Sequence, residues 1–264
     1  MKKLISVNNE DVKNYYQLTL KSKARKKNSI FLIEGLREIN LAISNNYKIV
    51  KLLFCPQILD LNVLQKKIYY SIEKTEISIE VYRKLAYRNS TEGIIAVSEF
   101  KNHNLSEISL KSNNPLIVVI EAPEKPGNIG ALLRTSDAAN VDAVIIANPK
   151  TDLYNPNIIR SSVGSLFTNS IYTGSTSNII KYLKENNIQI ITSSLNASKI
   201  YSNQSFLNRC AIILGTEDKG LTNEWIESSD NNIIIPMHGK IDSLNLSIAA
   251  AILIFEAKRQ RNLY

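Results

Sequence analysis

Apolar runs alternate with amphipathic segments through the second half of the chain. Short runs rich in β-branched residues predict strands at 116–120, 143–147, 189–192, 211–214 and 232–235. Apolar residues recur at helical spacing over 129–139 and 243–259, and Asn155-Pro156 predicts another helix start. Strands that alternate with helices predict a parallel sheet covered by helices on both faces.

The first half alternates in the same way on a smaller scale. Its apolar runs predict strands at 30–35, 50–54 and 93–97, and its helical spacings predict helices at 36–45, 60–71 and 78–86. This half therefore predicts a small α/β/α unit.

A polar segment rich in Asn and Ser separates the two halves. It spans residues 101–115 and ends at Pro115, as linkers between domains often do. We therefore expect one domain over 1–103, a linker over 104–114 and a second domain over 115–264.

Composition excludes several classes of protein. None of the 264 residues belongs to an apolar run long enough to span a membrane, and the first residues lack a signal-peptide pattern. With only 2 Cys and 2 His, the chain offers neither a disulfide framework nor a predicted metal site. We expect a cytoplasmic protein.

The net charge of +8 is divided unevenly along the chain. Residues 1–103 contain 18 Lys and Arg against 10 Asp and Glu, whereas residues 104–264 contain 14 of each. This asymmetry predicts a module that binds a polyanion, attached to a neutral module. The alternative is a basic solvated surface without a partner.

The loop after the predicted strand at 116–120 holds chemically suggestive residues. Gly127 and Gly130 permit close backbone approach, and Asn128 either caps the next helix or serves a site. Arg134, about one helical turn further on, lies either at the edge of a site or along the surface.

Two later strands are followed by similar loops. In one, Gly215 and Gly220 bracket a short acidic turn that includes Glu217. In the other, Ser243 is placed to cap the last helix, and Asn245 stands in an otherwise apolar segment. Because ligands bind at the carboxyl ends of parallel strands, the three loops together predict one site.

These loops resemble the three motifs of the SpoU (also called TrmH) family of RNA ribose 2′-O-methyltransferases, in the SPOUT superfamily. The matched positions are Asn128, Gly130 and Arg134 in the first motif, Gly215, Glu217 and Gly220 in the second, and Met237, Gly239, Ser243, Leu244 and Asn245 in the third. Residues 1–100 resemble the family's substrate-binding domain, which is similar to ribosomal protein L30e, most clearly in the segment FLIEGLREI.

The resemblance implies a parallel-sheet domain with a C-terminal trefoil knot, S-adenosylmethionine as cofactor, and a homodimer with the active site near its interface. It assigns cofactor contacts to Gly215, Ile235, Met237, Ser243 and Leu244. The strand at 116–120 is not followed by G-x-G-x-x-G, which argues against a Rossmann-type methyltransferase.

The resemblance assigns activation of the ribose hydroxyl to Arg134, assisted by a substrate phosphate. A guanidinium almost never loses its proton to become a base. Arg134 would therefore serve equally well by binding the substrate phosphate and orienting the hydroxyl. The pocket would be shaped, and Arg134 held in place, by Asn128, Glu217, Ser243 and Asn245. An alternative role for Glu217 is that of the general base.

The function implied is methylation of a ribose 2′-hydroxyl in RNA, with 23S ribosomal RNA as the expected substrate. The predicted phosphate contacts are Lys21, Lys23, Arg25, Lys26 and Lys27, while Arg160 is either a further phosphate contact or a solvated arginine. The alternatives are a transfer-RNA substrate, a ribosomal-RNA methylation that confers antibiotic resistance, and a non-catalytic RNA-binding or ribosome-assembly protein.

Overall fold

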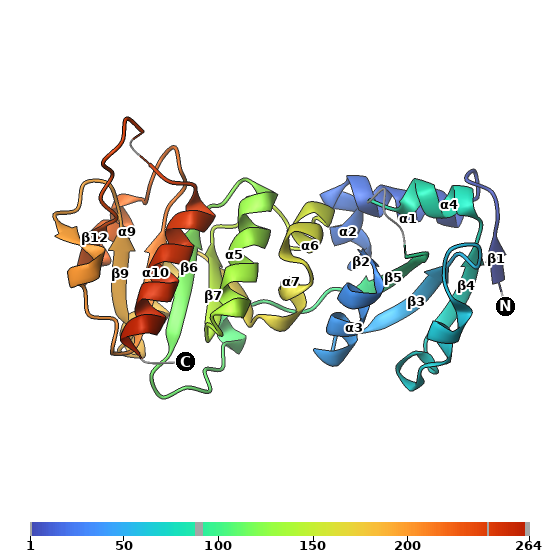
Figure 1. Ribbon diagram of the computed structural model, residues 1–264, viewed down its shortest axis with the longest axis horizontal. Helices are drawn as coiled ribbons and strands as arrows, with labels where there is room; N and C mark the ends of the chain where they lie inside the picture. Colours follow the sequence, from blue (N-terminus) through green and yellow to red (C-terminus); the bar gives the residue numbers. More distant parts are fainter. Residues whose placement is uncertain (1, 88–91, 242, 262–264) are drawn as a thin grey trace. The chain divides into compact units, whose positions relative to one another are not determined.

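The computed structural model describes residues 2–87, 92–241 and 243–261, which form two compact units (Figure 1). The first unit is Met1–Asn102 with Asp152–Thr168, and the second is His103–Thr151 with Asn169–Tyr264. The chain therefore passes between the units three times. The sequence-based division places residues 152–168 in the second domain, whereas in the structure this segment packs within the first unit. Among the described residues, no helix is both long and apolar enough to cross a membrane.

The second unit is built on a parallel sheet, as its alternating pattern predicts. Within the described residues its strands are β6 (Leu116–Glu121), β7 (Ala143–Ala147), β8 (Ile171–Gly174), β9 (Gln189–Ser193), β10 (Lys199–Ile200), β11 (Cys210–Leu214) and β12 (Asn231–Ile234). Their order across the sheet is β10-β12-β9-β11-β6-β7-β8, with every pairing parallel. The strands expected from the pattern are all present, and the short β8 and β10 add to them.

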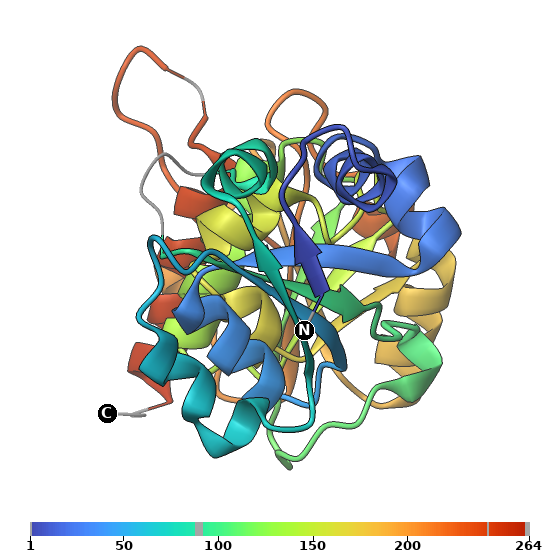
Figure 2. The same ribbon diagram turned by 90° about the vertical axis from the view of Figure 1, so that its right-hand side faces the viewer.

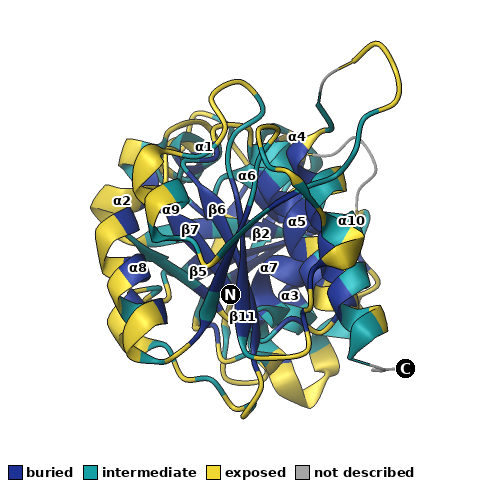
Figure 3. Cartoon of the chain, turned by 90° about the vertical axis from the view of Figure 1, so that its left-hand side faces the viewer, coloured by how far each residue is buried: buried dark blue, intermediate teal, exposed yellow. Residues whose placement is uncertain are grey.

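Helices cover both faces of this sheet (Figure 3). One face carries α5 (Pro126–Ala138) and α10 (Leu246–Gln260), and the other carries α8 (Thr176–Glu185) and α9 (Asn223–Ser228). Successive side chains of a strand point to opposite faces, so Ile117 and Val119 of β6 share one core cluster with Trp225 of α9. Every residue of β6 is buried, which is typical of a strand in the middle of a parallel sheet.

The helices that border the predicted site begin at different residues from those expected. Asn245, not Ser243, caps α10, because its side chain accepts a hydrogen bond from the Ser247 amide. Helix α5 begins at Pro126, whose fixed φ suits the first helical position, so Asn128 lies inside the helix and does not cap it.

Helix α10 is apolar almost all round, which predicts a buried helix, but part of its surface is exposed. Ile248 and Phe255 are 52% and 51% exposed, so the helix leaves an apolar strip uncovered in the single chain. The trefoil knot implied by the resemblance stays a prediction.

The first unit has a mixed sheet of the order β1-β4-β3-β5-β2. Its strands are β1 (Lys2–Leu4), β2 (Ile30–Glu34), β3 (Ile49–Phe54), β4 (Glu73–Ile77) and β5 (Ile94–Glu99), of which β5 runs antiparallel to both its neighbours. Its helices before residue 102 are α1 (Glu10–Leu20), α2 (Ser22–Asn28), α3 (Leu36–Ser44) and α4 (Ile79–Leu85). Helices α1 and α4 lie side by side (Figure 2). Their buried apolar residues belong to one core cluster. The helix expected over 60–71 forms instead as two 3₁₀ turns, Leu61–Gln65 and Lys67–Tyr69.

The segment 152–168 carries α6 (Pro156–Ser162) and α7 (Ser165–Thr168). Its Tyr154 ring stacks on Phe31 of β2, with ring centroids 4.0 Å apart. A polar anchor lies nearby, where Arg25 donates from Nε and Nη2 to the two carboxylate oxygens of Asp152 at 3.1 and 2.7 Å. Both side chains are nearly inaccessible, at 3% and 6% exposed.

This ion pair corrects the prediction for Arg25. Burial and a bidentate partner leave its guanidinium unable to contact RNA, whereas Lys21, Lys23, Lys26 and Lys27 of the same basic run are exposed. Burial raises the pKa of Asp152, but the hydrogen bonds from Arg25 and Ser22, together with the charge of Arg25, outweigh burial and hold that pKa below its ordinary value.

Replacing Arg25 by Met should destabilise the first unit by about 3–5 kcal/mol, because Asp152 would remain buried without a counter-charge. Urea-induced unfolding followed by circular dichroism measures the loss. Lys23→Met on the same helix removes an exposed charge and should change stability by less than about 0.5 kcal/mol. Equal losses in the two variants would show that the buried pair does not stabilise this unit.

Candidate active site

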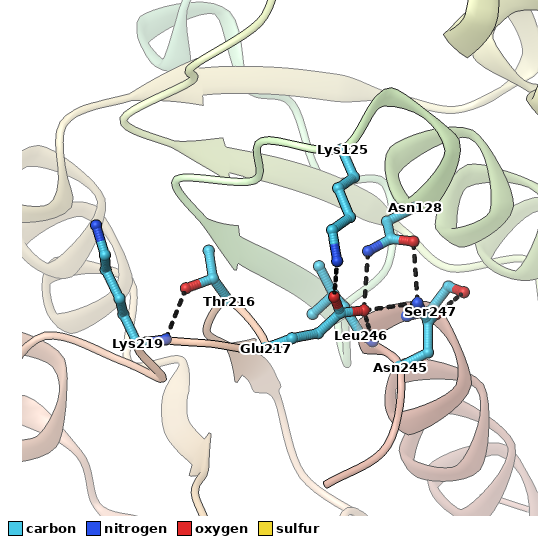
Figure 4. A network of polar contacts seen from close by, with 8 residues as sticks. All are labelled: Lys125, Asn128, Thr216, Glu217, Lys219, Asn245, Leu246 and Ser247. Carbon is cyan, nitrogen blue, oxygen red and sulfur yellow. Dashed lines mark hydrogen bonds and ion pairs between the residues drawn. The ribbon is translucent and has the colours of Figure 1, made fainter.

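One carboxylate, that of Glu217, joins the three loops that the sequence singles out (Figure 4). Its Oε1 accepts hydrogen bonds from the Asn128 side chain at 3.1 Å, the Asn245 side chain at 2.6 Å and the Leu246 amide at 3.1 Å. Its Oε2 accepts from Lys125 Nζ at 2.5 Å. The loop after β11 is thereby bound to the N-terminal ends of α5 and α10, and we call this set of contacts the Glu217 network.

Asn245 uses both ends of its side chain in this network. Its Nδ2 donates to Asn128 Oδ1 at 3.1 Å as well as to Glu217. Its Oδ1 accepts from the amide and the hydroxyl of Ser247, at 3.0 and 2.6 Å. The asparagine that stands out in an apolar segment is therefore both a helix cap and a bridge between two loops.

The network keeps Glu217 ionised. The hydrogen bond from Lys125 is the largest influence, followed by that from the Leu246 amide, and together they hold the pKa of Glu217 below its ordinary value. A carboxylate surrounded by donors is a weak base, which favours an organising role for Glu217 over the general-base alternative. Lys125 is exposed, and nothing in the sequence around Pro126 distinguishes it in advance.

A cavity of about 480 Å³ opens beside the network. Its wall includes every residue predicted to contact the cofactor, namely Gly215, Ile235, Met237, Ser243 and Leu244. These residues come from the ends of β11 and β12 and from the segment before α10, so the carboxyl-end rule for parallel strands locates the cavity correctly.

The cavity wall also contains a segment that the sequence analysis did not select. Ser193, the last residue of β9, lines the same cavity together with the three residues after it, Ser194, Leu195 and Asn196. The strand over 189–192 is predicted, so the rule that directs attention to strand ends could have found this fourth loop.

Gly215 is required where it stands. A Cβ at this position would overlap the backbone of Gly220, because the loop closes tightly on itself. The Gly220 amide donates to the Thr216 carbonyl at 2.9 Å, and Gly220 has a φ of +65°, which favours glycine. The two glycines that bracket the acidic turn therefore fold it into a compact hairpin that presents Glu217.

A second, smaller cavity of about 260 Å³ adjoins the first. Its lining includes Lys125, Asn128 and Asp218. Thr216, Glu217, Asp218 and Leu246 line both cavities. The Glu217 network thus forms the partition between a larger and a smaller binding space.

Arg134 is the predicted site residue that the single chain does not bring to the others. It lies on α5 with an exposed side chain, lines neither cavity, and makes no hydrogen bond or ion pair within the described part of the chain. Ser243 lines the larger cavity but takes no part in the Glu217 network as the structure describes it.

Comparisons with known proteins agree with this geometry. Residues 115–255 match the family described as the SpoU rRNA Methylase family, and residues 9–96 match the MRM3-like substrate binding domain. The chain is 26% identical to the 23S rRNA (guanosine(2553)-2′-O)-methyltransferase RlmP of Bacillus subtilis, over 98% of this chain and 100% of the relative.

Two solved structures are similar over almost the whole chain. One is a crystal structure of an RNA 2′-O ribose methyltransferase, with 35% identity, a TM-score of 0.85 and coverage of 99% of this chain and 100% of that one. The other is the AdoMet-bound rRNA methyltransferase from Sinorhizobium meliloti, with 27% identity, a TM-score of 0.90 and coverage of 100% and 98%.

Glu217→Gln should loosen the network, because one carboxylate oxygen becomes an amide donor that faces other donors. We expect hydrogen exchange at the Leu246 amide to accelerate about fivefold or more, the effect of losing one hydrogen bond. In the wild type the same protection should persist above the ordinary carboxyl pKa of 4.5 and be lost as the pH falls through the lowered pKa of Glu217.

Glu227→Gln, at an exposed position on α9, is the matched control and should leave the Leu246 amide unchanged. Unaltered exchange at Leu246 in the Glu217→Gln variant would contradict the assignment of Glu217 as the residue that joins the loops.

Proposed function

Because the chain belongs to the SpoU rRNA methylase family, we propose that it transfers a methyl group from S-adenosylmethionine to a ribose 2′-hydroxyl of 23S ribosomal RNA. The observation that carries this proposal is the 480 Å³ cavity, whose wall contains all the predicted cofactor contacts. The similarity to RlmP, a 23S rRNA 2′-O-methyltransferase, over both full lengths supports the substrate.

The cavity suits the cofactor in size and in chemistry. Its volume lies within the usual range for sites that hold a ligand of this size. Gly215, Ile235 and Leu244 offer backbone amides and carbonyls, which can hydrogen-bond the edge of an adenine and the hydroxyls of a ribose. When bound, S-adenosylmethionine supplies a methyl group activated by a positively charged sulfur.

The protein's own residues then have two tasks. The Glu217 network fixes the wall between the cavities, so that a ribose entering the smaller cavity meets the cofactor in a set orientation. Arg134 binds the phosphate next to that ribose and stabilises the negative charge that develops on the 2′-oxygen as this oxygen takes the methyl group. The hydroxyl proton passes through that phosphate to solvent water, and S-adenosylhomocysteine would be the other product. No metal ion has a role in this scheme.

The proposed enzyme is a homodimer whose active site lies near the interface. The uncovered strip on α10, with Ile248 and Phe255, provides an apolar surface for a second copy. Helix α5, which carries the exposed Arg134, packs against α10. Arg134 is therefore placed to contribute to a site formed by two copies.

The first unit is the proposed RNA-binding module. Residues 1–103 carry all of the net charge of +8, and the match to an MRM3-like substrate binding domain covers most of them. The exposed Lys21, Lys23, Lys26 and Lys27 supply phosphate contacts. We place the reaction in the cytoplasm, where its substrate would be found.

Transfer of labelled methyl from S-adenosylmethionine to unmodified 23S ribosomal RNA, transfer RNA and assembled large subunits tests the proposal. A single alkali-resistant bond in 23S RNA, free or assembled, is the expected result. Methylation of transfer RNA but not of 23S ribosomal RNA would show that transfer RNA is the substrate. Failure to bind the cofactor would favour a non-catalytic RNA-binding protein.

Arg134→Ala should reduce methyl transfer more than about 100-fold while S-adenosylmethionine affinity stays nearly unchanged, because Arg134 lines neither cavity. Rates measured at saturating cofactor, with calorimetric titration of the cofactor, check both parts. Lys181→Ala removes one exposed positive charge from α8 and serves as the control. A variant that keeps more than about a tenth of the wild-type rate would remove Arg134 from the mechanism.

Changing Lys21, Lys23, Lys26 and Lys27 together to Ala should weaken RNA binding and flatten its salt dependence, by about 0.7–0.9 in slope for each lost phosphate contact. Filter binding at several salt concentrations measures the slope. The control changes four exposed lysines elsewhere in the first unit, Lys13, Lys48, Lys66 and Lys67. Equal slopes in the two variants would show that α2 has no special place in RNA binding.

A further inference from the structure

The first unit carries an exposed arginine whose guanidinium lies over the ring of a half-exposed tyrosine. The guanidinium of Arg160, on α6, lies 5.8 Å from the ring centroid of Tyr87. Tyr87 is 48% exposed, and Arg160 is also exposed. Within the described residues the Arg160 side chain has no hydrogen bond or ion pair, so its guanidinium donors are open to a ligand.

Both members of this pair are held by rigid neighbours. The Tyr87 amide donates to Glu34 Oε2 at 2.7 Å, which fixes the backbone of Tyr87 to the end of β2. Helix α6 begins at an asparagine cap, where Asn155 accepts from the Asn157 amide at 2.9 Å. The buried pair of Arg25 and Asp152 anchors the same segment three residues earlier. The backbone at Tyr87 and at the start of helix α6 is therefore fixed, which keeps the two side chains next to one another.

The surroundings favour a ligand that lies on the pair. A hollow of only about 30 Å³ lies beside it, lined by residues that include Thr19, Glu34 and Ile159. This hollow holds about one water molecule and is far too small for a nucleobase. A nucleobase would therefore contact the pair on its exposed surface, outside the hollow.

The charge of the neighbouring surface indicates which ligand this is. Thr19, near the end of α1, lines the hollow, and the lysines of α2 begin two residues later at Lys21. A surface that combines exposed lysines with a flat pair of an aromatic ring and a guanidinium matches RNA, whose phosphates need cations and whose unpaired bases need planar partners. An acidic peptide would need the cations but not the flat pair.

We propose that Tyr87 and Arg160 form a stacking platform for an unpaired base of the substrate RNA. The inference rests on the proposed function only in taking RNA as the substrate. Arg160 belongs to the connection between β7 and β8, two strands of the catalytic sheet, although this connection folds with the first unit. A base held on the platform therefore contacts the same stretch of chain that links two catalytic strands.

Binding of an unmodified 23S ribosomal RNA transcript to the full-length protein tests the platform. Tyr87→Ala should weaken binding about 5- to 150-fold without changing the salt slope, because stacking involves no counterion release. Tyr87→Phe keeps the ring and should restore most of the affinity. Tyr70→Ala, which removes a 66% exposed tyrosine from the same unit, is the matched control and should have no effect.

A double-mutant cycle with Arg160→Ala separates stacking from simple charge. On the platform the effects of Tyr87→Ala and Arg160→Ala should be less than additive, and neither should weaken binding of a fully paired RNA helix. If Arg160→Ala flattens the salt slope and Tyr87→Ala behaves like Tyr70→Ala, Arg160 is a phosphate contact and the platform is wrong.

These results are independent of the test of the proposed function. A wild type that binds the transcript but transfers no methyl group would overturn the proposed activity, and a sensitive Tyr87→Ala variant would still support the platform. An insensitive Tyr87→Ala variant would overturn the platform whatever the rate of methyl transfer.

Discussion

The arrangement of the candidate active site depends on the hydrogen bonds of the Glu217 carboxylate. Its two oxygens accept four donors, which come from the N-terminal end of α5 and from the start of α10. A carboxylate can satisfy that many donors only while it is ionised, and the donors in turn favour the ionised form. The loops after three strands are thus held together by one residue whose charge they themselves stabilise.

This constraint explains why the neighbouring residues are of the kinds found. Asn128 and Asn245 each offer a donor and an acceptor on one short side chain, so they can bond to Glu217 and to one another. Glycine at position 215 lets the loop after β11 turn back on Gly220, which brings Glu217 to the other two loops. The cavities on either side share the wall that this network builds.

A different electrostatic device organises the first unit. The Arg25–Asp152 pair fastens a segment from between β7 and β8 onto helix α2, so residues distant in sequence fold into one unit. A buried ion pair adds little net stability compared with apolar packing, but it is strongly selective, because each charge tolerates only its partner. We regard the pair as setting where the segment docks, with the stacking of Tyr154 on Phe31 supplying apolar contact beside it.

Local patterns along the chain are enough to predict the parallel sheet, the strands at its centre and the three loops of the site, because each depends on residues close together in the chain. Periodicity locates β6, β7, β9, β11 and β12. The position of the three loops after strands of one sheet, together with the family resemblance, predicts that Asn128, Glu217 and Asn245 belong to one site. Helix ends were less well determined, since Pro126 and Asn245 compete with neighbouring residues that could also begin a helix.

Contacts between side chains that are distant in the sequence become visible only in the folded molecule. In the sequence, Arg25 is one of several cations in a basic run. The structure shows that it is buried and paired with Asp152, 127 residues away. Nothing in the sequence distinguishes Lys125 from other lysines, but in the structure it donates to Glu217. In the same way, only the structure shows that Arg160 lies over the ring of Tyr87. Periodicity and local spacing reflect the secondary structure of a residue's own segment. The burial of a side chain and its partners depend on segments distant in the sequence, which come together only on folding.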